Sequence, residues 1–248
     1  WDHFVAETCR HGLWGAENLS LIPGEVGAAA VQNIGAYGVE MKDLVSGGVC
    51  FDLQERRKVK FSREECRYGY RDSAFKHELR GRYAVTHVHF RLSHEFRPRL
   101  DYGGIRNALA ERGFDETNLT AEQLRQTIIE IRRAKLPEPS ELGNAGSFFT
   151  NPIVSRETFE RLLSENPDMP HYKVDAEQIK IPAGWMIEQC GWKGKALGRA
   201  GVYDKQALVL VNLGRATGND IKTLCERIQA DVYAKFGINI TPEVNFIS

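Results

Sequence analysis

Hydrophobic residues recur every three or four positions in several stretches of the chain, and this spacing predicts helices. The clearest helix runs to about Lys135 and begins at a capping box formed by Thr120 and Gln123. Its apolar face consists of Leu124, Ile128 and Ile131. Further helices are predicted over residues 2–11, 155–163, 183–190 and 219–235.

Other stretches predict strands. A β-hairpin is expected over residues 43–53 and 56–61, and single strands over 83–93, 177–181 and 206–213. The prolines at 137 and 139 mark a linker at which the composition changes. Helices and strands on both sides of that linker predict an α+β protein with two lobes.

The segment from residue 20 to residue 40 is small, apolar and interrupted by glycine, with polar Gln32 and Asn33 in its middle. We expect a loop that can lie against a flat apolar ligand while its backbone N–H groups face phosphates. A tightly packed core helix of small residues is the alternative, and the alanine-rich centre is compatible with one helical turn.

Composition narrows the range of partners. The 248 residues include 33 basic and 33 acidic side chains, which gives no basis for a nucleic-acid or membrane-surface partner. No apolar run approaches the ~18 residues of a membrane span, and no secretory signal opens the sequence. Five dispersed cysteines predict reduced thiols and a cytoplasmic location, and His87 and His89 are expected on a solvated strand face without a metal.

Residues 143–152 combine glycines, a serine, two phenylalanines and an asparagine. The glycines let the backbone approach a ligand, and the Ser147 hydroxyl can give or take a proton. Phe148 and Phe149 would form an apolar wall beside it. Taken alone, the segment is better explained as a glycine-rich turn before a buried strand than as a binding loop that leads into a strand.

Two charged residues stand out elsewhere. Arg71 lies beside Tyr70 in a turn-like segment, where an arginine can hold a carboxylate through two hydrogen bonds. A solvated ion pair with Asp72 is the alternative. Glu243 lies in an apolar segment near the end of the sequence, so its carboxyl group is either solvent-exposed or kept neutral in a pocket.

Six segments together resemble the UDP-N-acetylenolpyruvoylglucosamine reductases, the MurB family of flavin enzymes in peptidoglycan precursor synthesis. They occur in the family's order along essentially the whole chain, at residues 22–24, 32–38, 69–73, 135–137, 143–149 and 242–244. Residues 100–103 further resemble the subtype in which a tyrosine-bearing loop closes over the substrate.

The resemblance implies a two-lobed FAD-binding reductase. Its flavin domain would cover residues 1–136, an α/β substrate-binding domain residues 137–236, and a C-terminal strand, residues 237–248, would return to the active site. The family also has an N-terminal region with a glycine-rich turn that cradles the FAD diphosphate, and this sequence holds no counterpart of it. The oligomeric state is left open, a monomer included.

The resemblance also implies the reaction. NADPH would reduce FAD, and hydride would then pass to UDP-N-acetylglucosamine enolpyruvate to give UDP-N-acetylmuramate. Ser147 would protonate the substrate α-carbon, Arg71 would pair with the substrate carboxylate, and Glu243 would donate a further hydrogen bond to that carboxylate. A different FAD-linked oxidoreductase of this fold and a non-catalytic UDP-sugar-binding remnant remain as alternatives.

The binding residues follow from the same resemblance. Those expected to contact the substrate, its diphosphate or its nucleotide are Tyr37, Tyr70, Tyr102, Lys135, Asn151 and Gln189. Those expected to contact FAD are Ile22, Pro23, Gly24, Gly27, Ala28, Gln32, Asn33 and Gly35. No metal ligand is expected.

Overall fold

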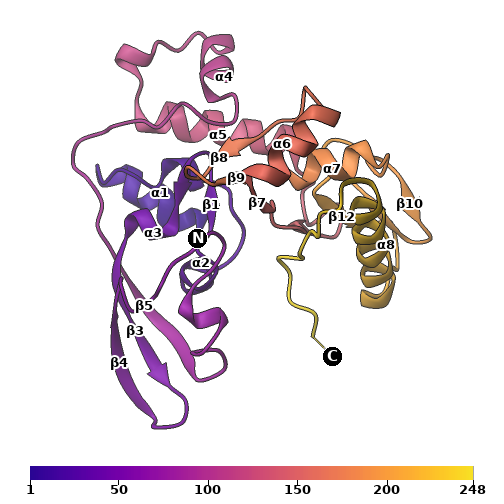
Figure 1. Ribbon diagram of the computed structural model, residues 1–248. Coiled ribbons are helices and arrows are strands. Elements are labelled where there is room, and N and C mark those ends of the chain that lie inside the picture. Colours follow the sequence, from indigo (N-terminus) through magenta and orange to yellow (C-terminus); the bar gives the residue numbers. More distant parts are fainter. Residues whose placement is uncertain (248) are drawn as a thin grey trace. The chain divides into compact units, whose positions relative to one another are not determined.

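A computed structural model describes residues 1–247, and the chain divides into two compact units, Trp1–Ala134 and Lys135–Ser248 (Figure 1). Both units contain helices and antiparallel sheets, which confirms the α+β class. Within the described residues, no helix is both long and apolar enough to cross a membrane.

The first unit is built around a long three-stranded sheet. The helices are α1 (Asp2–Arg10), α2 (Val26–Gln32), α3 (Met41–Leu44), α4 (Ile105–Glu111) and α5 (Ala121–Lys135), with 3₁₀ helices η1 (Glu17–Leu19), η2 (Ala74–Lys76) and η3 (Glu116–Asn118). The strands are β1 (Gly35–Ala36), β2 (Val39–Glu40), β3 (Val45–Asp52), β4 (Arg57–Ser62) and β5 (Tyr83–Phe90). The sheet order is β4-β3-β5, and the three strands run side by side in Figure 1.

The predicted hairpin is confirmed as β3 and β4. Buried Asp52 closes its turn by accepting hydrogen bonds from the backbone nitrogens of Gln54 (2.9 Å) and Glu55 (3.0 Å). The guanidinium of Arg82 binds the same carboxylate through Nη2 at 2.9 Å and holds the pKa of Asp52 well below its usual range. One carboxylate therefore joins the turn to the start of β5.

For the centre of residues 20–40 the structure bears out the helical alternative rather than the loop. The helix α2 forms there, because Ala29 and Ala30 pack into the core and alanine has the highest helix propensity. It ends at Asn33, whose φ of 47° lies in the left-handed region that terminates helices. The exposed residues before the helix keep the character of a loop.

The second unit holds two smaller sheets. Its strands are β6 (Asn144–Ser147), β7 (Ile153–Ser155), β8 (Tyr172–Lys173), β9 (Gln178–Lys180), β10 (Ala196–Leu197), β11 (Ala200–Val202) and β12 (Val209–Asn212). Its helices are α6 (Arg156–Glu165), α7 (Ala183–Gln189) and α8 (Gly218–Phe236). The sheet orders are β10-β11-β12-β6 and β7-β9-β8.

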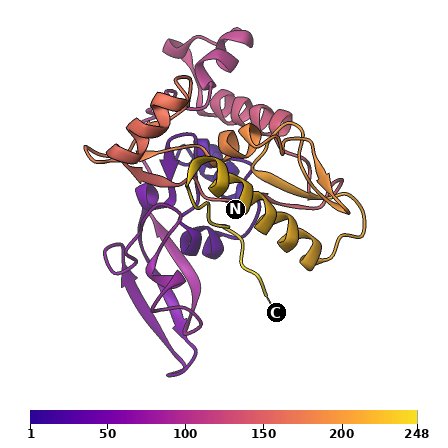
Figure 2. The ribbon, with the colours of Figure 1, turned by 45° about the vertical axis from the view of Figure 1, so that its right-hand side comes forward.

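Helix α8 is the main support of the first of these sheets (Figure 2). It begins at a Thr217–Asp220 capping box and ends at Gly237, whose φ of 68° suits glycine. Its buried face packs against β11 and β12 and consists of Leu224, Cys225, Ile228, Val232 and Phe236.

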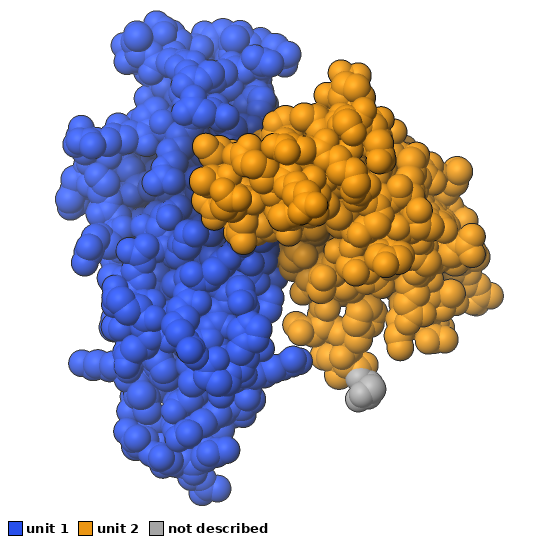
Figure 3. All heavy atoms as spheres, in the orientation of Figure 1, with its two compact units in different colours: residues 1–134 blue, residues 135–248 orange. Residues whose placement is uncertain are grey.

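Each unit has its own hydrophobic core. One large cluster fills residues 135–248, and three smaller clusters fill residues 1–134, the unit coloured blue in Figure 3. Among residues 1–247, each of these clusters takes its buried residues from one unit. The division at residues 134 and 135 lies close to the Pro137 at which the composition changes.

Candidate functional site

Arg71 lies in a tight turn from Gly69 to Asp72. The Asp72 nitrogen donates to the Gly69 oxygen at 3.1 Å, and the Gly69 nitrogen donates to the Asp72 oxygen at 2.9 Å. Arg71 has a φ of 54°, the positive value that the third position of a type II turn requires and that arginine rarely adopts. Lys76 holds this conformation by donating from Nζ to the Arg71 carbonyl at 2.8 Å.

The guanidinium of Arg71 lies directly on the backbone of Gly35. Its Nη2 donates to the Gly35 oxygen, and a Cβ at Gly35 would be 2.6 Å from Nη1. The Tyr70 ring centroid is 5.2 Å from the guanidinium carbon, within cation–π range. Three residues predicted for the site, Arg71, Tyr70 and Gly35, therefore come together, and glycine is the residue that leaves room for the arginine.

Asn33 is fully buried and is hydrogen-bonded to this turn. Its Nδ2 donates to the Gly69 oxygen at 2.5 Å and to Glu40 Oε2 at 3.1 Å, while its Oδ1 accepts from the Lys42 nitrogen at 2.9 Å. The amide is thus occupied by the protein itself. Asn33 acts on the site by placing the turn that carries Arg71.

The other residues predicted to contact FAD differ in exposure. Pro23, Gly24 and Ala28 are exposed, and a Cβ at Gly24 would meet no heavy atom within 4 Å. Ile22 packs against the core, Gln32 is half-buried, and Gly27 lies so close to β5 that a Cβ there would be 3.2 Å from the Val85 oxygen. The small exposed surface of Pro23, Gly24 and Ala28 suits a flat ring system.

The residue before this segment, Leu21, is held by charged side chains that the sequence patterns did not indicate. Its nitrogen donates to Asp2 Oδ1 at 2.6 Å, and its oxygen accepts from Arg132 Nε at 3.2 Å. The other Asp2 oxygen accepts from Nη2 of buried Arg125 at 2.7 Å. Leu21 has a φ of 57°, so these bonds hold a backbone conformation that leucine seldom adopts.

Tyr37 and Tyr102 are brought together in the first unit. Tyr37 and Gly38 form the two-residue turn between β1 and β2, and both have positive φ, as a type I′ turn requires. The Tyr37 ring covers Gly103, where a Cβ would be 2.6 Å from Tyr37 Cδ1. A Cβ on Gly38 would lie 3.6 Å from Tyr102 Cβ.

Arg132, which binds the Leu21 oxygen, also interacts with Tyr37. Burial raises the pKa of Tyr37, and the charge and the hydrogen bond of Arg132 lower it by less. Burial in turn lowers the pKa of Arg132. Arg132, in the last turn of α5, is therefore directed inward to the tyrosine and to Leu21.

In the second unit, Ser147 is exposed at the end of β6 and pairs with Val209 of β12. Phe148 and Phe149 follow it and are buried in the large core cluster. Both interpretations of residues 143–152, a glycine-rich turn or a binding loop before a strand, were therefore wrong in order, since residues 144–147 themselves form the strand. The phenylalanines anchor the serine rather than line the surface beside it.

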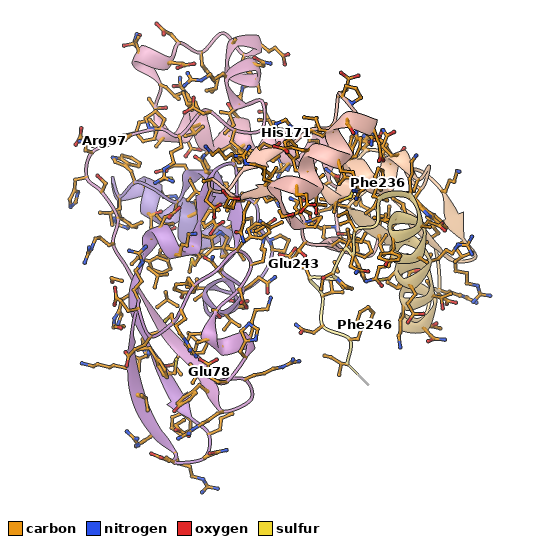
Figure 4. All side chains as sticks on the ribbon, viewed as in Figure 1. Glu78, Arg97, His171, Phe236, Glu243 and Phe246 are labelled. Carbon is orange, nitrogen blue, oxygen red and sulfur yellow. The ribbon has the colours of Figure 1, made fainter. Side chains whose placement is uncertain are left out.

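The backbone of Glu243 is hydrogen-bonded to Phe148, the residue that follows Ser147. Its nitrogen donates to the Phe148 oxygen at 2.8 Å, and the Thr150 nitrogen donates to the Thr241 oxygen at 2.9 Å. Figure 4 shows Glu243 and Phe246 on the segment that follows Phe236 and α8. These bonds bring together two predicted catalytic residues from opposite ends of the second unit's sequence.

The remaining predicted residues lie on separate elements. The Asn151 Oδ1 accepts from the Ala183 nitrogen at 2.9 Å and thereby caps α7. Exposed Gln189 ends that helix, and its carbonyl accepts from Lys235 Nζ at 2.6 Å. Lys135 is the exposed last residue of α5. Arg71 belongs to the first unit, while Ser147 and Glu243 belong to the second.

Comparisons with known proteins agree on one family. Residues 138–247 match the family model described as UDP-N-acetylenolpyruvoylglucosamine reductase, C-terminal domain. The chain is 55% identical over 247 residues to the UDP-N-acetylenolpyruvoylglucosamine reductase of Bacteroides fragilis (strain YCH46), covering 100% of this chain and 73% of the relative. It is 49% identical over 243 residues to the enzyme of the same name from Burkholderia ambifaria, covering 98% and 70%.

A solved structure is also similar. It is the crystal structure of UDP-N-acetylenolpyruvylglucosamine reductase (MurB) from Thermus caldophilus, with a TM-score of 0.64 and 25% sequence identity. The match covers 98% of this chain and 68% of that one. The similarity therefore extends over both compact units.

Proposed function

Because the chain belongs to the family of UDP-N-acetylenolpyruvoylglucosamine reductases, we propose that Arg71, Ser147 and Glu243 carry out the chemistry of that reductase here. The reaction is the NADPH-dependent, FAD-mediated reduction of UDP-N-acetylglucosamine enolpyruvate to UDP-N-acetylmuramate. The observation that supports the assignment is the backbone hydrogen bond from the Glu243 nitrogen to the oxygen of Phe148, the residue that follows Ser147, since it joins the two segments that carry the proposed acid and the proposed serine.

The chemistry that bound FAD would supply is hydride transfer from NADPH to the enolpyruvyl group. Within this chain, the exposed Pro23, Gly24 and Ala28 would hold the flavin. Asp2 and Arg132 would keep that segment in place, because they bind the N–H and the C=O of Leu21, the residue before it. Asn33 would not contact the flavin directly, because its amide is bonded within the protein. It would hold the turn that carries Arg71.

Ser147 would give its hydroxyl proton to the substrate α-carbon. A serine is a weak acid, but a carbanion-like carbon is a very strong base, so the position of the hydroxyl matters more than its acidity. The pairing of Ser147 with Val209 and the burial of Phe148 fix that position. Because Ser147 is exposed, its hydroxyl would be accessible to a substrate without movement of β6.

Arg71 and Glu243 would stabilise the charge that builds on the substrate carboxylate. The bond to the Gly35 oxygen and the positive φ hold the Arg71 guanidinium in one orientation before any substrate arrives. Donors that are already oriented stabilise a developing anion without reorganisation. Glu243 in its protonated form would add a neutral donor to the same carboxylate. The substrate diphosphate and nucleotide are assigned to Tyr37, Tyr70, Tyr102, Lys135, Asn151 and Gln189.

The experiment that tests the assignment compares the two half-reactions of Ser147→Ala by stopped-flow absorbance. We expect flavin reduction by NADPH within about twofold of the unaltered protein, and flavin reoxidation by the enolpyruvyl sugar slowed by about 10²–10³. The matched control is Ser164→Ala, which removes an exposed hydroxyl that bonds the Arg161 carbonyl within α6.

Two outcomes would contradict the proposal. Equal losses in both half-reactions of Ser147→Ala would remove the proton-donor role. An unaltered protein that binds the UDP-sugar but shows no flavin absorbance near about 450 nm would favour the non-catalytic alternative.

A further inference from the structure

Asn18 is buried within η1, with only 2% of its surface exposed. Its single side-chain nitrogen donates two hydrogen bonds to backbone carbonyls, to the Tyr37 oxygen at 2.7 Å and to the Arg99 oxygen at 2.9 Å. The acceptors are remote from Asn18 in sequence and lie in different loops. One loop is the turn between β1 and β2, and the other leads from β5 to α4.

The same two loops also meet at their surface. The Tyr37 ring covers Gly103, Gly38 lies against the Cβ of Tyr102, and Arg99 Nη1 donates to the Gly38 oxygen at 3.2 Å. The side chain of Arg99 is exposed, so its bond to Gly38 lies at the surface, whereas Asn18 and its two bonds are buried. Asn18 therefore fixes the distance between the two loops through hydrogen bonds in the interior.

We propose that Asn18 is a positioning residue for the UDP-sugar. By tying the Tyr37 and Arg99 carbonyls to one nitrogen, it holds Tyr37 and Tyr102 at the separation needed to bind one substrate together. The inference rests on the proposed function, which assigns both tyrosines to the substrate. It adds a residue that touches neither substrate nor cofactor and acts through two loops.

The geometry makes the role specific to an amide. The nitrogen of Asn18 supplies two N–H groups, one for each carbonyl. Asn18→Asp keeps the size and shape of the side chain but replaces both donors with an acceptor. The buried carbonyls then face a carboxylate oxygen, so the loops must move apart or recruit water.

The test measures steady-state kinetics and flavin reduction for Asn18→Asp. We expect KM for UDP-N-acetylglucosamine enolpyruvate to rise about tenfold or more, because buried carbonyls that lose their donors no longer fix the loops. We expect kcat and the rate of flavin reduction by NADPH to stay within about twofold. Asn18→Ser, which keeps one donor, should give a smaller rise in KM and serves if Asn18→Asp does not fold.

The matched control is Thr127→Val on α5. Thr127 is equally buried in the same unit, and its hydroxyl bonds the Gln123 oxygen at 2.8 Å and Arg112 Nη1 at 3.1 Å, away from both loops. An unchanged KM in both Asn18 variants would overturn the proposal. So would an equal rise in KM in Thr127→Val at the same loss of thermal stability, since the effect would then be general destabilisation.

The unaltered protein separates this inference from the function on which it rests. If it neither shows flavin reduction nor consumes the enolpyruvyl sugar, the proposed function fails. If it does both and the Asn18 variants keep its KM, only the positioning role fails.

Discussion

Arg71 shows at the scale of one residue how an unfavourable backbone conformation can be stabilised by its neighbours. A positive φ costs a residue with a side chain on the order of 1–3 kcal/mol, so the contacts around it must offset that cost. Here the turn hydrogen bonds, Lys76 and the Gly35 carbonyl all act on Arg71. Strain of this kind is concentrated at functional sites, in agreement with the role proposed for this arginine.

Gly35→Ala tests that support without altering Arg71. A Cβ at position 35 would be 2.6 Å from Arg71 Nη1 and 2.9 Å from Glu40 Cγ, so the guanidinium must leave its place. We expect turnover of the enolpyruvyl sugar to fall by about 10²-fold, as for the loss of one oriented donor. Gly218→Ala is the control, because a Cβ there meets no atom within 4 Å. Turnover equal to that of the control would show that the position of Arg71 does not depend on Gly35.

Sequence patterns and the resemblance indicated the residues proposed to carry the chemistry, but not the residues that hold them in place. Arg71, Gly35 and Tyr70 occur in glycine-rich motifs, and the structure places them together. Asn18 is different, because its two acceptors lie far along the chain and no local spacing indicates them. The bond between Asp2 and Arg125 was missed for the same reason.

At the scale of elements, capping motifs and hydrophobic spacing in the sequence predicted helix positions well, because these features act within the helix itself. The Thr120–Gln123 box has both of its reciprocal bonds, and the helix predicted over residues 219–235 is present as α8 (Gly218–Phe236). Two errors arose where tertiary burial decides the outcome. Helix α2 forms because Ala29 and Ala30 enter the core, and residues 144–147 become a strand because β12 offers them an edge.

The β3–β4 hairpin gives a prediction about pH. Hydrogen bonding to Arg82 lowers the pKa of Asp52. A carboxyl whose folded pKa is lowered contributes stability above its unfolded pKa of about 3.9, and that contribution is lost as pH falls toward the folded pKa. Asp52→Asn should therefore lower the melting temperature at pH 7, with a difference that shrinks below about pH 4. Melting curves across pH measure this.

The control for the hairpin is Asp101→Asn. Its side chain is 90% exposed and pairs with Arg106 at the surface, so the same charge is removed with little effect at pH 7. A difference between Asp52→Asn and the unaltered protein that does not shrink as the pH falls from 7 to well below 4 would show that the ionised carboxylate is not the source of the stability.

At the scale of the whole molecule, the chain consists of two compact units. The change in composition at Pro137 gave the approximate boundary, because proline disrupts a helix and the predicted elements resume after it. The contacts within each unit could not be predicted in the same way. They join residues such as Phe148 and Glu243 that only the completed fold brings together.

Separate cores predict separate unfolding transitions. Leu124 and Ile228 are both fully buried, one in each unit, and each lies in a cluster confined to its own unit. Truncation of either to alanine should cost about 2–5 kcal/mol of stability. Differential scanning calorimetry should show Leu124→Ala lowering one transition and Ile228→Ala lowering the other. Limited proteolysis within residues 135–143, followed by mass spectrometry, would identify which fragment melts in each. If both variants shifted one shared transition by the same amount, the two cores would be unfolding as a single cooperative unit, and the independence inferred from their separate packing would be wrong.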